Sequence, residues 1–250
     1  MYNEVNKFHK IDKKKIFIIG TIQYESYLNK QILSKNLIRK RYTLDKKKKT
    51  ALVCLESPTS FKDNEKILKT LLKYSNSHHN IQFIVRPHPL SFRTKEGRYV
   101  YKKEFESFKR YSKISKNLIF DYPKINSMKL SHDMPKFEEK KLGGLLNYVD
   151  FVLCFYSSIM LEATIFKKPV INMSFCSRTT IPNKVLSKLK HNERILNYGY
   201  VYDVKNICQK IDQGLNQWLV LSVEIKKFCK CCNNYNKVKS SSLGGILIES

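Results

Sequence analysis

The chain has 250 residues and 42% hydrophobic content, which is enough to bury a sizeable core. Lysine and arginine number 47 against 21 acidic residues, so the formal net charge is +26. No apolar run reaches the roughly eighteen residues of a membrane-spanning helix, and the polar start of the chain lacks a signal-peptide core, so we expect a cytoplasmic protein. Gly-x-Gly-x-x-Gly and Walker-type motifs are absent, which argues against a nicotinamide cofactor and against a P-loop NTPase.

Strand-like and helix-like segments alternate along the chain. Apolar runs of strand length predict strands at 16–19, 51–55, 81–85, 118–120, 149–155, 170–173 and 200–202. Helical spacing predicts helices at 27–38, from Asn64 onward, and at 103–111, 135–146, 159–166, 204–218, 223–232 and 241–248. This alternation predicts an α/β fold, a doubly wound, Rossmann-like parallel sheet whose strand ends meet at one edge.

The segment 147–175 has the clearest local pattern, because it reads as strand, tight turn, helix and strand. Ser157 and Ser158 fall in the turn, where they could cap the helix while its first N–H groups face a phosphate. Glu162 follows Ser158 by one helical turn, and a carboxylate there suits a ribose diol. The plainer alternative is a serine cap followed by a solvated glutamate.

A second loop follows the strand predicted at 81–85. Arg86 and His88 alternate with Pro87 and Pro89, and two prolines fix the backbone as a rigid, extended turn. Arginine offers planar bidentate donors, and histidine can donate a hydrogen bond or a proton near neutral pH. The loop therefore suits a phosphate, although a structural histidine between prolines is the alternative.

Several polar segments follow predicted strands and would meet at the same edge of a parallel sheet. These segments are Glu56–Thr59, with Ser57 and Thr59, Arg86–Pro89, Asp121–Pro123, Tyr156–Ser158 and Ser174–Ser177. Their hydroxyl, guanidinium and imidazole groups suit a diphosphate. His191 lies on a long connection that could also reach the nucleotide. His78 and His79 would lie at the opposite edge, in a solvated turn.

At this point the residues resemble a known family. Arg-Pro-His-Pro at 86–89, the stretch Tyr-Val-Asp-Phe-Val-Leu-Cys-Phe-Tyr-Ser-Ser-Ile-Met-Leu-Glu-Ala at 148–163 and Lys-Pro-Val-Ile at 168–171 resemble the C-terminal, donor-binding half of GT-B glycosyltransferases. The nearest likeness is to surface and capsule polysaccharide enzymes and to the CDP-glycerol glycerophosphotransferase group, which makes teichoic acid. The turn after Gly20 is similar to the opening turn of this half, with Ile22 for proline and Glu25 for aspartate.

The resemblance implies roles for four of these side chains. His88 would contact the donor phosphate and stabilise the leaving nucleoside phosphate, as the catalytic residue. Ser157 and Ser158 would hold the pyrophosphate, and Glu162 would bind the ribose hydroxyls. The donor nucleotide is then a substrate, and neither a cofactor nor a metal is implied.

The likeness covers only one of the two domains of a GT-B enzyme. We predict a basic leader at 1–15 and one donor-binding domain at 16–250. The acceptor-binding domain precedes this half in the family. Three alternatives follow: the chain is a fragment, its acceptor half is a separate polypeptide, or it has lost transferase activity.

The cysteines indicate no metal site and no disulfide framework. Cys54 and Cys154 fall in predicted strands as small hydrophobic residues, and Cys229, Cys231 and Cys232 would point in different directions on a helix. The seven cysteines are irregularly spaced, which suits a reducing compartment.

Three functions remain open from the sequence. The first is a glycosyltransferase-like or glycerophosphotransferase-like donor domain, and the second is a sugar-nucleotide epimerase of the UDP-N-acetylglucosamine 2-epimerase type. The third is a non-catalytic, basic protein that binds polyanions or anionic membranes, with Lys13–Lys15 reaching the cytoplasmic face of the membrane. A genome rich in A and T would produce the same lysine content. No nucleic-acid-binding module is recognisable, so no specific nucleic acid partner is expected.

Overall fold

The computed structural model describes residues 7–18, 24–125, 134–173, 197–201, 204–213, 215 and 246–248. The chain forms two compact units, residues 1–31 with 219–250 and residues 32–218. The partition predicted from the sequence, a leader and one domain, stays a prediction. Among the described residues, no helix combines the length and apolar character that a bilayer-spanning segment requires.

In the first unit, two short strands pair with each other. Strand β1 (Ile16–Ile18) runs antiparallel to β10 (Ile246–Ile248), and the unit also contains the 3-10 turn η1 (Lys13–Lys15) and helix α2 (Glu25–Leu28). The strand predicted at 16–19 is therefore present, but outside the large sheet. The helix predicted at 241–248 is wrong for its last residues, because three consecutive apolar residues, two of them β-branched, favour strand pairing.

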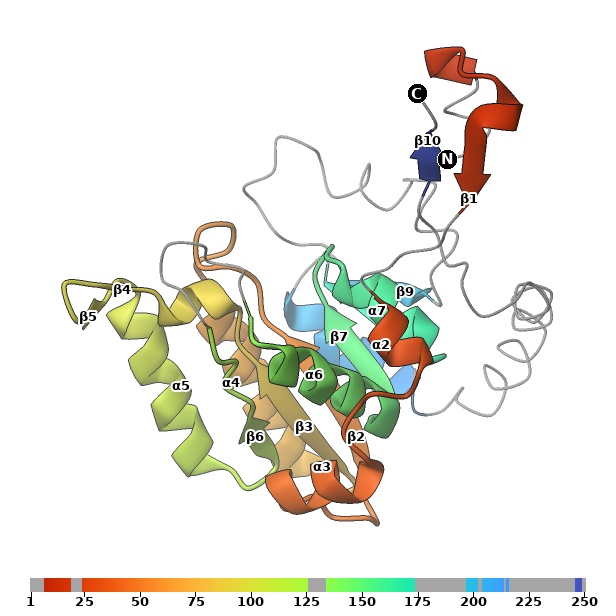
Figure 1. Ribbon diagram of the computed structural model, residues 1–250. Coiled ribbons are helices and arrows are strands. Elements are labelled where there is room, and N and C mark those ends of the chain that lie inside the picture. The colour runs from red at the N-terminus through yellow and green to blue at the C-terminus, as the bar shows by residue number, and fades with distance from the viewer. Residues whose placement is uncertain are drawn as a thin grey trace. The chain divides into compact units, whose positions relative to one another are not determined.

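The second unit is built on six parallel strands in the order β6-β3-β2-β7-β8-β9 (Figure 1). Their bounds are β2 (Lys49–Cys54), β3 (Ile81–Arg86), β6 (Leu118–Phe120), β7 (Phe151–Cys154), β8 (Val170–Met173) and β9 (Asn197–Val201). This sheet confirms the predicted doubly wound, Rossmann-like fold.

Helices cover both faces of the sheet. They are α3 (Lys35–Tyr42), α4 (Asn64–Ser77), α5 (Lys102–Ile114), α6 (Lys136–Tyr148), α7 (Ile159–Ile165), the 3-10 turn η5 (Val204–Asn206) and the helical residues 207–213. The single helix predicted at 27–38 is wrong, because Ser34 begins a new helix and its Oγ accepts a hydrogen bond from the Leu37 amide. Two further elements were not predicted from the sequence: the 3-10 turn η3 (Pro89–Phe92) and the hairpin of β4 (Thr94–Lys95) and β5 (Arg98–Tyr99).

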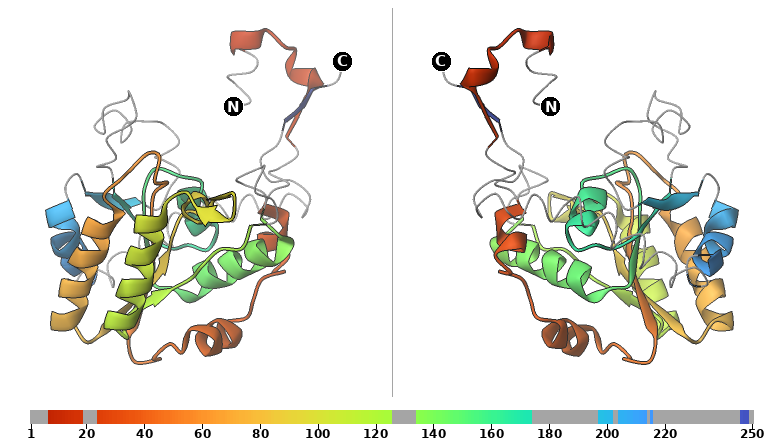
Figure 2. Two further views of the ribbon diagram at one scale, coloured as in Figure 1. Left: turned by 90° about the vertical axis from the view of Figure 1, so that its left-hand side faces the viewer. Right: turned by 90° about the vertical axis from the view of Figure 1, so that its right-hand side faces the viewer.

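Alternate residues of each strand enter different cores. In β2, Ala51 and Val53 pack under α4, α5 and residues 207–213, whereas Leu52 and Cys54 pack under α3, α6 and α7. Figure 2 shows α4 and α5 on one side of the sheet and α6 on the other. Because both faces of the sheet are buried, the strands are apolar along most of their length, as expected for a parallel sheet.

At the amino ends of the strands, a set of polar contacts joins β2, β3 and β7. The buried Gln82 donates from Nε2 to Thr50 Oγ1 and to the Asp45 carbonyl, both at 2.9 Å, and its Oε1 accepts from the Asp45 amide at 3.1 Å. The Thr50 amide donates to Asp150 Oδ2 at 2.8 Å. We call Asp45, Thr50, Gln82 and Asp150 the amino-edge contacts.

Gly144 lies where α6 meets the segment before α3. A Cβ atom at this position would lie 2.8 Å from the Leu33 carbonyl oxygen and 2.9 Å from Leu33 Cβ. The Leu33 amide is itself bonded to the Lys140 carbonyl at 3.1 Å, so this neighbour cannot move away freely. The close approach therefore requires glycine.

We expect Gly144→Ala to lower the free energy of unfolding by about 1–3 kcal/mol through overpacking. This sign is opposite to the gain of up to about 1 kcal/mol that alanine ordinarily brings within a helix. Urea denaturation followed by circular dichroism measures the change, with Lys140→Ala at an exposed position of the same helix as the control. A stabilised Gly144→Ala variant would contradict the close approach.

Candidate functional site

The strand order reverses between β2 and β7. From β2 the chain crosses through α4 to β3 on one side, and from β7 it crosses through α7 to β8 on the other. In such sheets a crevice opens at the carboxyl ends of the two central strands, and ligands bind there. Cys54 is paired in register with both Arg86 and Cys154, so the carboxyl ends of β2, β3 and β7 lie level. The loops carrying the predicted site residues leave from these three strand ends.

The loop after β2 is held by its own side chains. Ser57 Oγ lies 2.7 Å from Thr59 Oγ1, and the Ser57 amide donates to Glu56 Oε1 at 2.7 Å. Ser57 is buried and its carbonyl accepts from the amides of Ser60 and Phe61, whereas Thr59 is exposed. Burial raises the pKa of the Glu56 carboxyl, and the bond from Ser57 opposes this rise. Of the two predicted hydroxyls, Thr59 is thus the accessible one and Ser57 shapes the loop.

His88 lies in the loop after β3 and begins η3. The Leu90 amide donates to His88 Nδ1 at 3.1 Å, and the Ser91 amide donates to the His88 carbonyl at 2.9 Å. Because Nδ1 accepts, the neutral ring carries its hydrogen on Nε2. The half-buried imidazole is therefore oriented by its own turn and can act as an N–H donor.

The turn after β7 differs from the prediction in one respect. Ser158 is the N-cap residue of α7, but its backbone is helical, with φ −57° and ψ −26°, and its side chain makes no capping hydrogen bond. A capping side chain needs an extended backbone to reach the second or third amide, so the predicted serine cap is wrong. The Ser157 and Ser158 side chains are instead exposed at the end of β7.

Glu162 lies one turn into α7, and only 5% of it is exposed. Its amide donates to the Ser158 carbonyl at 3.1 Å, which confirms the predicted helical spacing. Burial raises the pKa of the Cys54 thiol to about 12, and the nearby Glu162 carboxylate adds to the rise, as it does for Cys154. The carboxylate is therefore close to the ends of β2 and β7, which rules out a solvated glutamate.

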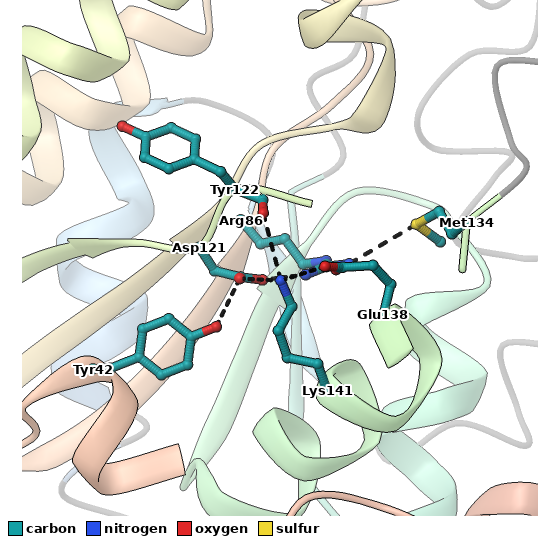
Figure 3. Close-up of polar contacts among 7 residues, drawn as sticks. All are labelled: Tyr42, Arg86, Asp121, Tyr122, Met134, Glu138 and Lys141. Carbon is teal, nitrogen blue, oxygen red and sulfur yellow. Dashed lines mark hydrogen bonds and ion pairs between the residues drawn. The ribbon is translucent and has the colours of Figure 1, made fainter. Parts of the chain in front are cut away.

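Arg86 belongs to a buried network of charged side chains, shown in Figure 3. Its guanidinium forms ion pairs with Asp121 and, at 3.2 Å, with Glu138 Oε2. Lys141 Nζ lies 2.7 Å from Asp121 Oδ1 and 2.8 Å from Glu138 Oε1, and the Tyr42 hydroxyl donates to Asp121 Oδ1 at 2.7 Å. Two cations and two carboxylates thus balance, and they connect β3, the end of β6, α3 and α6.

This network corrects the prediction for Arg86. Its guanidinium is bonded to the Asp121 and Glu138 carboxylates, so its donors are already engaged within the protein and it is not a cation open to a phosphate. The sequence analysis did not single out Tyr42, Glu138 or Lys141. The only signal for them was a glutamate and a lysine three residues apart in a helix, which usually indicates a solvated surface.

Some predicted residues lie outside the described part of the chain. These are His191, Ser174–Ser177, Cys229, Cys231 and Cys232. Cys54 and Cys154 are buried free thiols in their strands, as predicted. Within the described ranges, no three His, Cys, Asp or Glu side chains gather as a metal site would require.

Comparison of the sequence with protein-family models and with curated proteins gives no match. Comparison of the structure with solved structures does give matches. UDP-GlcNAc 2-epimerase from Methanocaldococcus jannaschii is similar over 84% of this chain, with a TM-score of 0.52 and 17% identity. The wall teichoic acid polymerase TagF is similar over 91%, with a TM-score of 0.50 and 15% identity. This chain has the fold of one half of a GT-B enzyme.

A third match is the UDP-GlcNAc 2-epimerase from Neisseria meningitidis, over 91% of this chain, with a TM-score of 0.53 and 11% identity. The GT-B half-domain spans about half of each matched chain, namely 52%, 50% and 52%. At these identities the likeness concerns the fold alone.

Proposed function

We propose that this chain is a donor-binding domain that takes a nucleoside-diphosphate-activated sugar, or CDP-glycerol, for the synthesis of a surface polysaccharide. The proposal is supported by the loops that leave the level ends of β2, β3 and β7, which carry an oriented imidazole and exposed hydroxyls, and by a buried carboxylate one turn into α7. The ends of the level strands β2, β3 and β7 are followed by Thr59, His88, Ser157 and Ser158, and Glu162 lies one helical turn after Ser158.

In this proposal each group has a distinct role. The Nε2–H of His88 and the hydroxyls of Ser157, Ser158 and Thr59 bind the diphosphate, and Glu162 accepts hydrogen bonds from the ribose. The reaction is displacement at the activated carbon or phosphorus, in which the nucleotide leaves with the bonding electron pair. His88 stabilises the negative charge that develops on the leaving phosphate, and most of the remaining catalysis is positioning.

A separate acceptor-binding domain completes the reaction in this proposal. The chain spans about half of the matched chains, and the deprotonating base for the acceptor is assigned to the other half of the cleft. An epimerase would bind its donor at the same crevice and gains no specific support over the transferase. We therefore retain the transferase, located in the cytoplasm.

Calorimetric titration with UDP, CDP, GDP and ADP tests the proposal. We expect saturable binding of a pyrimidine nucleoside diphosphate with a dissociation constant between about 1 μM and 1 mM, because one half of a cleft supplies part of the contacts. Pyrophosphate at the same ionic strength is the control, since a chain of charge +26 attracts any polyanion. If no nucleotide binds better than pyrophosphate, there is no donor site.

A further inference from the structure

The segment 35–49 is the most unbalanced in charge among the described surfaces. It contains eight basic residues and one acidic residue, Asp45. The basic residues are Lys35, Arg39, Lys40, Arg41, Lys46, Lys47, Lys48 and Lys49. Helix α3 has no acidic residue in its first turn and three basic residues in its last turn. Within the segment only Asp45 opposes this positive charge, and from outside it Asp150 pairs with Lys49 at 3.2 Å.

Large apolar side chains lie among these cations. Leu37 in α3 is 55% exposed and Phe137 in α6 is 41% exposed. The Arg41 guanidinium carbon lies 5.5 Å from the centre of the Phe137 ring, so the two helices present one continuous surface. Ile38 and Tyr42 pack inward against the sheet, which leaves the opposite side of α3 facing outward.

This outward side is hollowed. A depression of about 490 Å³ is lined by Asn36, Leu37, Arg39, Lys40 and Lys46. Arg39, one of the lining residues, has a buried Nε without a hydrogen-bond partner among the described residues. Burial, and after it the charge of the neighbouring Lys35, lowers the pKa of Lys168 to about 8, so Lys168 lies near the start of α3.

The surface lies at the edge of the sheet opposite to the donor crevice. Lys46–Lys48 directly precede β2, whereas Ser57 and Thr59 follow its end. Figure 1 shows α3 beside the amino ends of β2 and β3. Binding at this surface therefore leaves the crevice accessible.

We propose that α3, Lys46–Lys48 and Phe137 form a docking surface for an anionic phospholipid bilayer. Each lysine or arginine near such a bilayer contributes about 1 kcal/mol, and exposed leucine and phenylalanine enter the boundary between headgroups and acyl chains. Because the surface is positively charged, we expect its partner to be anionic. The exposed Leu37 and Phe137 favour a bilayer over a nucleic acid, because a nucleic acid has no apolar layer for these side chains to enter. The proposal is independent of the donor site and rests on other residues than those of the basic leader.

Vesicle co-sedimentation with the full chain at physiological salt tests the proposal. Phosphatidylcholine vesicles with and without phosphatidylserine are compared for wild type, a docking variant (Lys35→Glu, Lys40→Glu, Lys46→Glu) and a control of equal charge on α4 and α5 (Lys69→Glu, Lys73→Glu, Lys113→Glu). We expect the docking variant to lose at least about tenfold in affinity for anionic vesicles, and the control to lose about twofold or less. Equal losses in the two variants, or equal binding to both kinds of vesicle, would overturn the proposal.

Two further variants separate the bilayer from other partners. Leu37→Ser leaves the charge unchanged, and we expect it to weaken vesicle binding several-fold because the apolar insertion is lost. Replacing Lys13–Lys15 with glutamate should have a smaller effect than the docking variant. A docking variant that loses binding to a short RNA duplex as strongly as to vesicles, together with a silent Leu37→Ser, would identify a nucleic acid partner and overturn the proposal.

Discussion

Asp121→Asn should destabilise the chain by about 3–5 kcal/mol, because it leaves the buried cations Arg86 and Lys141 with one carboxylate between them. Water cannot solvate the uncompensated charge at sites that are 6% and 2% exposed. Urea denaturation monitored by circular dichroism measures the effect. The matched control is Asp63→Asn, whose exposed pair with Lys66 is worth about 1 kcal/mol or less.

The stability difference between wild type and Asp121→Asn should decrease only as the pH is lowered. Burial alone would raise the pKa of Asp121, but Arg86 and Lys141 outweigh burial and hold this pKa below its usual range. In the unfolded chain the pKa is about 3.9, so the carboxylate stabilises fully above that value and loses its contribution as pH falls through the folded pKa. The difference between wild type and Asp121→Asn should stay constant from neutral pH to about pH 5 and close at lower pH. A difference that shrinks between pH 8 and pH 6 would contradict the assignment.

His88→Ala and Glu162→Gln should weaken nucleotide binding in distinguishable ways. A hydrogen bond to a charged group is worth about 1.5–3 kcal/mol, so each variant should lose about 10- to 150-fold in affinity. Loss of His88 should affect the nucleoside diphosphate and leave the plain nucleoside nearly unchanged, since the imidazole is assigned to the phosphates. Loss of the Glu162 charge should affect both, and the defect should disappear with a deoxyribose analogue.

Calorimetry on matched variants checks these differences. His79→Ala replaces an exposed histidine at the other edge of the sheet, and Glu106→Gln replaces an exposed glutamate of α5, so both should bind like wild type. If His88→Ala and Glu162→Gln also bind like wild type while remaining folded, the roles assigned to these two side chains are wrong.

The large sheet could be predicted from the sequence because its strands are buried on both faces. A run such as 81–85, apolar except for Gln82, is informative by itself, and the alternation of such runs with helices leaves few topologies. The helix predicted at 27–38 failed because apolar spacing was followed across Ser34, whose side chain begins a new helix. The strand at 246–248 pairs with 16–18, and no local pattern reveals so distant a partner.

In the candidate site, too, features set by neighbouring residues were predicted, whereas contacts between residues far apart in the sequence were not. Glu162 was placed correctly because its spacing from Ser158 is a property of one helix. Arg86 was misjudged because its partners Asp121 and Glu138 lie far along the chain, and only the folded topology brings them together. From the sequence alone, an arginine next to a histidine at a strand end is easily interpreted as a phosphate ligand. Only the fold shows that this arginine forms ion pairs with two carboxylates.

The amino-edge contacts carry a consequence for the geometry of the distant crevice. A strand with one solvent-exposed face is held in register because its polar and apolar residues alternate. Strand β2 packs apolar side chains on both faces. A shift of one residue would therefore still bury apolar side chains. Gln82 and Asp150 oppose such sliding, since each engages Thr50 with directional hydrogen bonds. A slip of one residue would displace the end of β2, and with it Thr59, by about 3.3 Å relative to His88 and Ser157. The Gln82 amide and the Asp150 carboxylate, at the amino end of the sheet, thus fix the alignment of the loops at its carboxyl end.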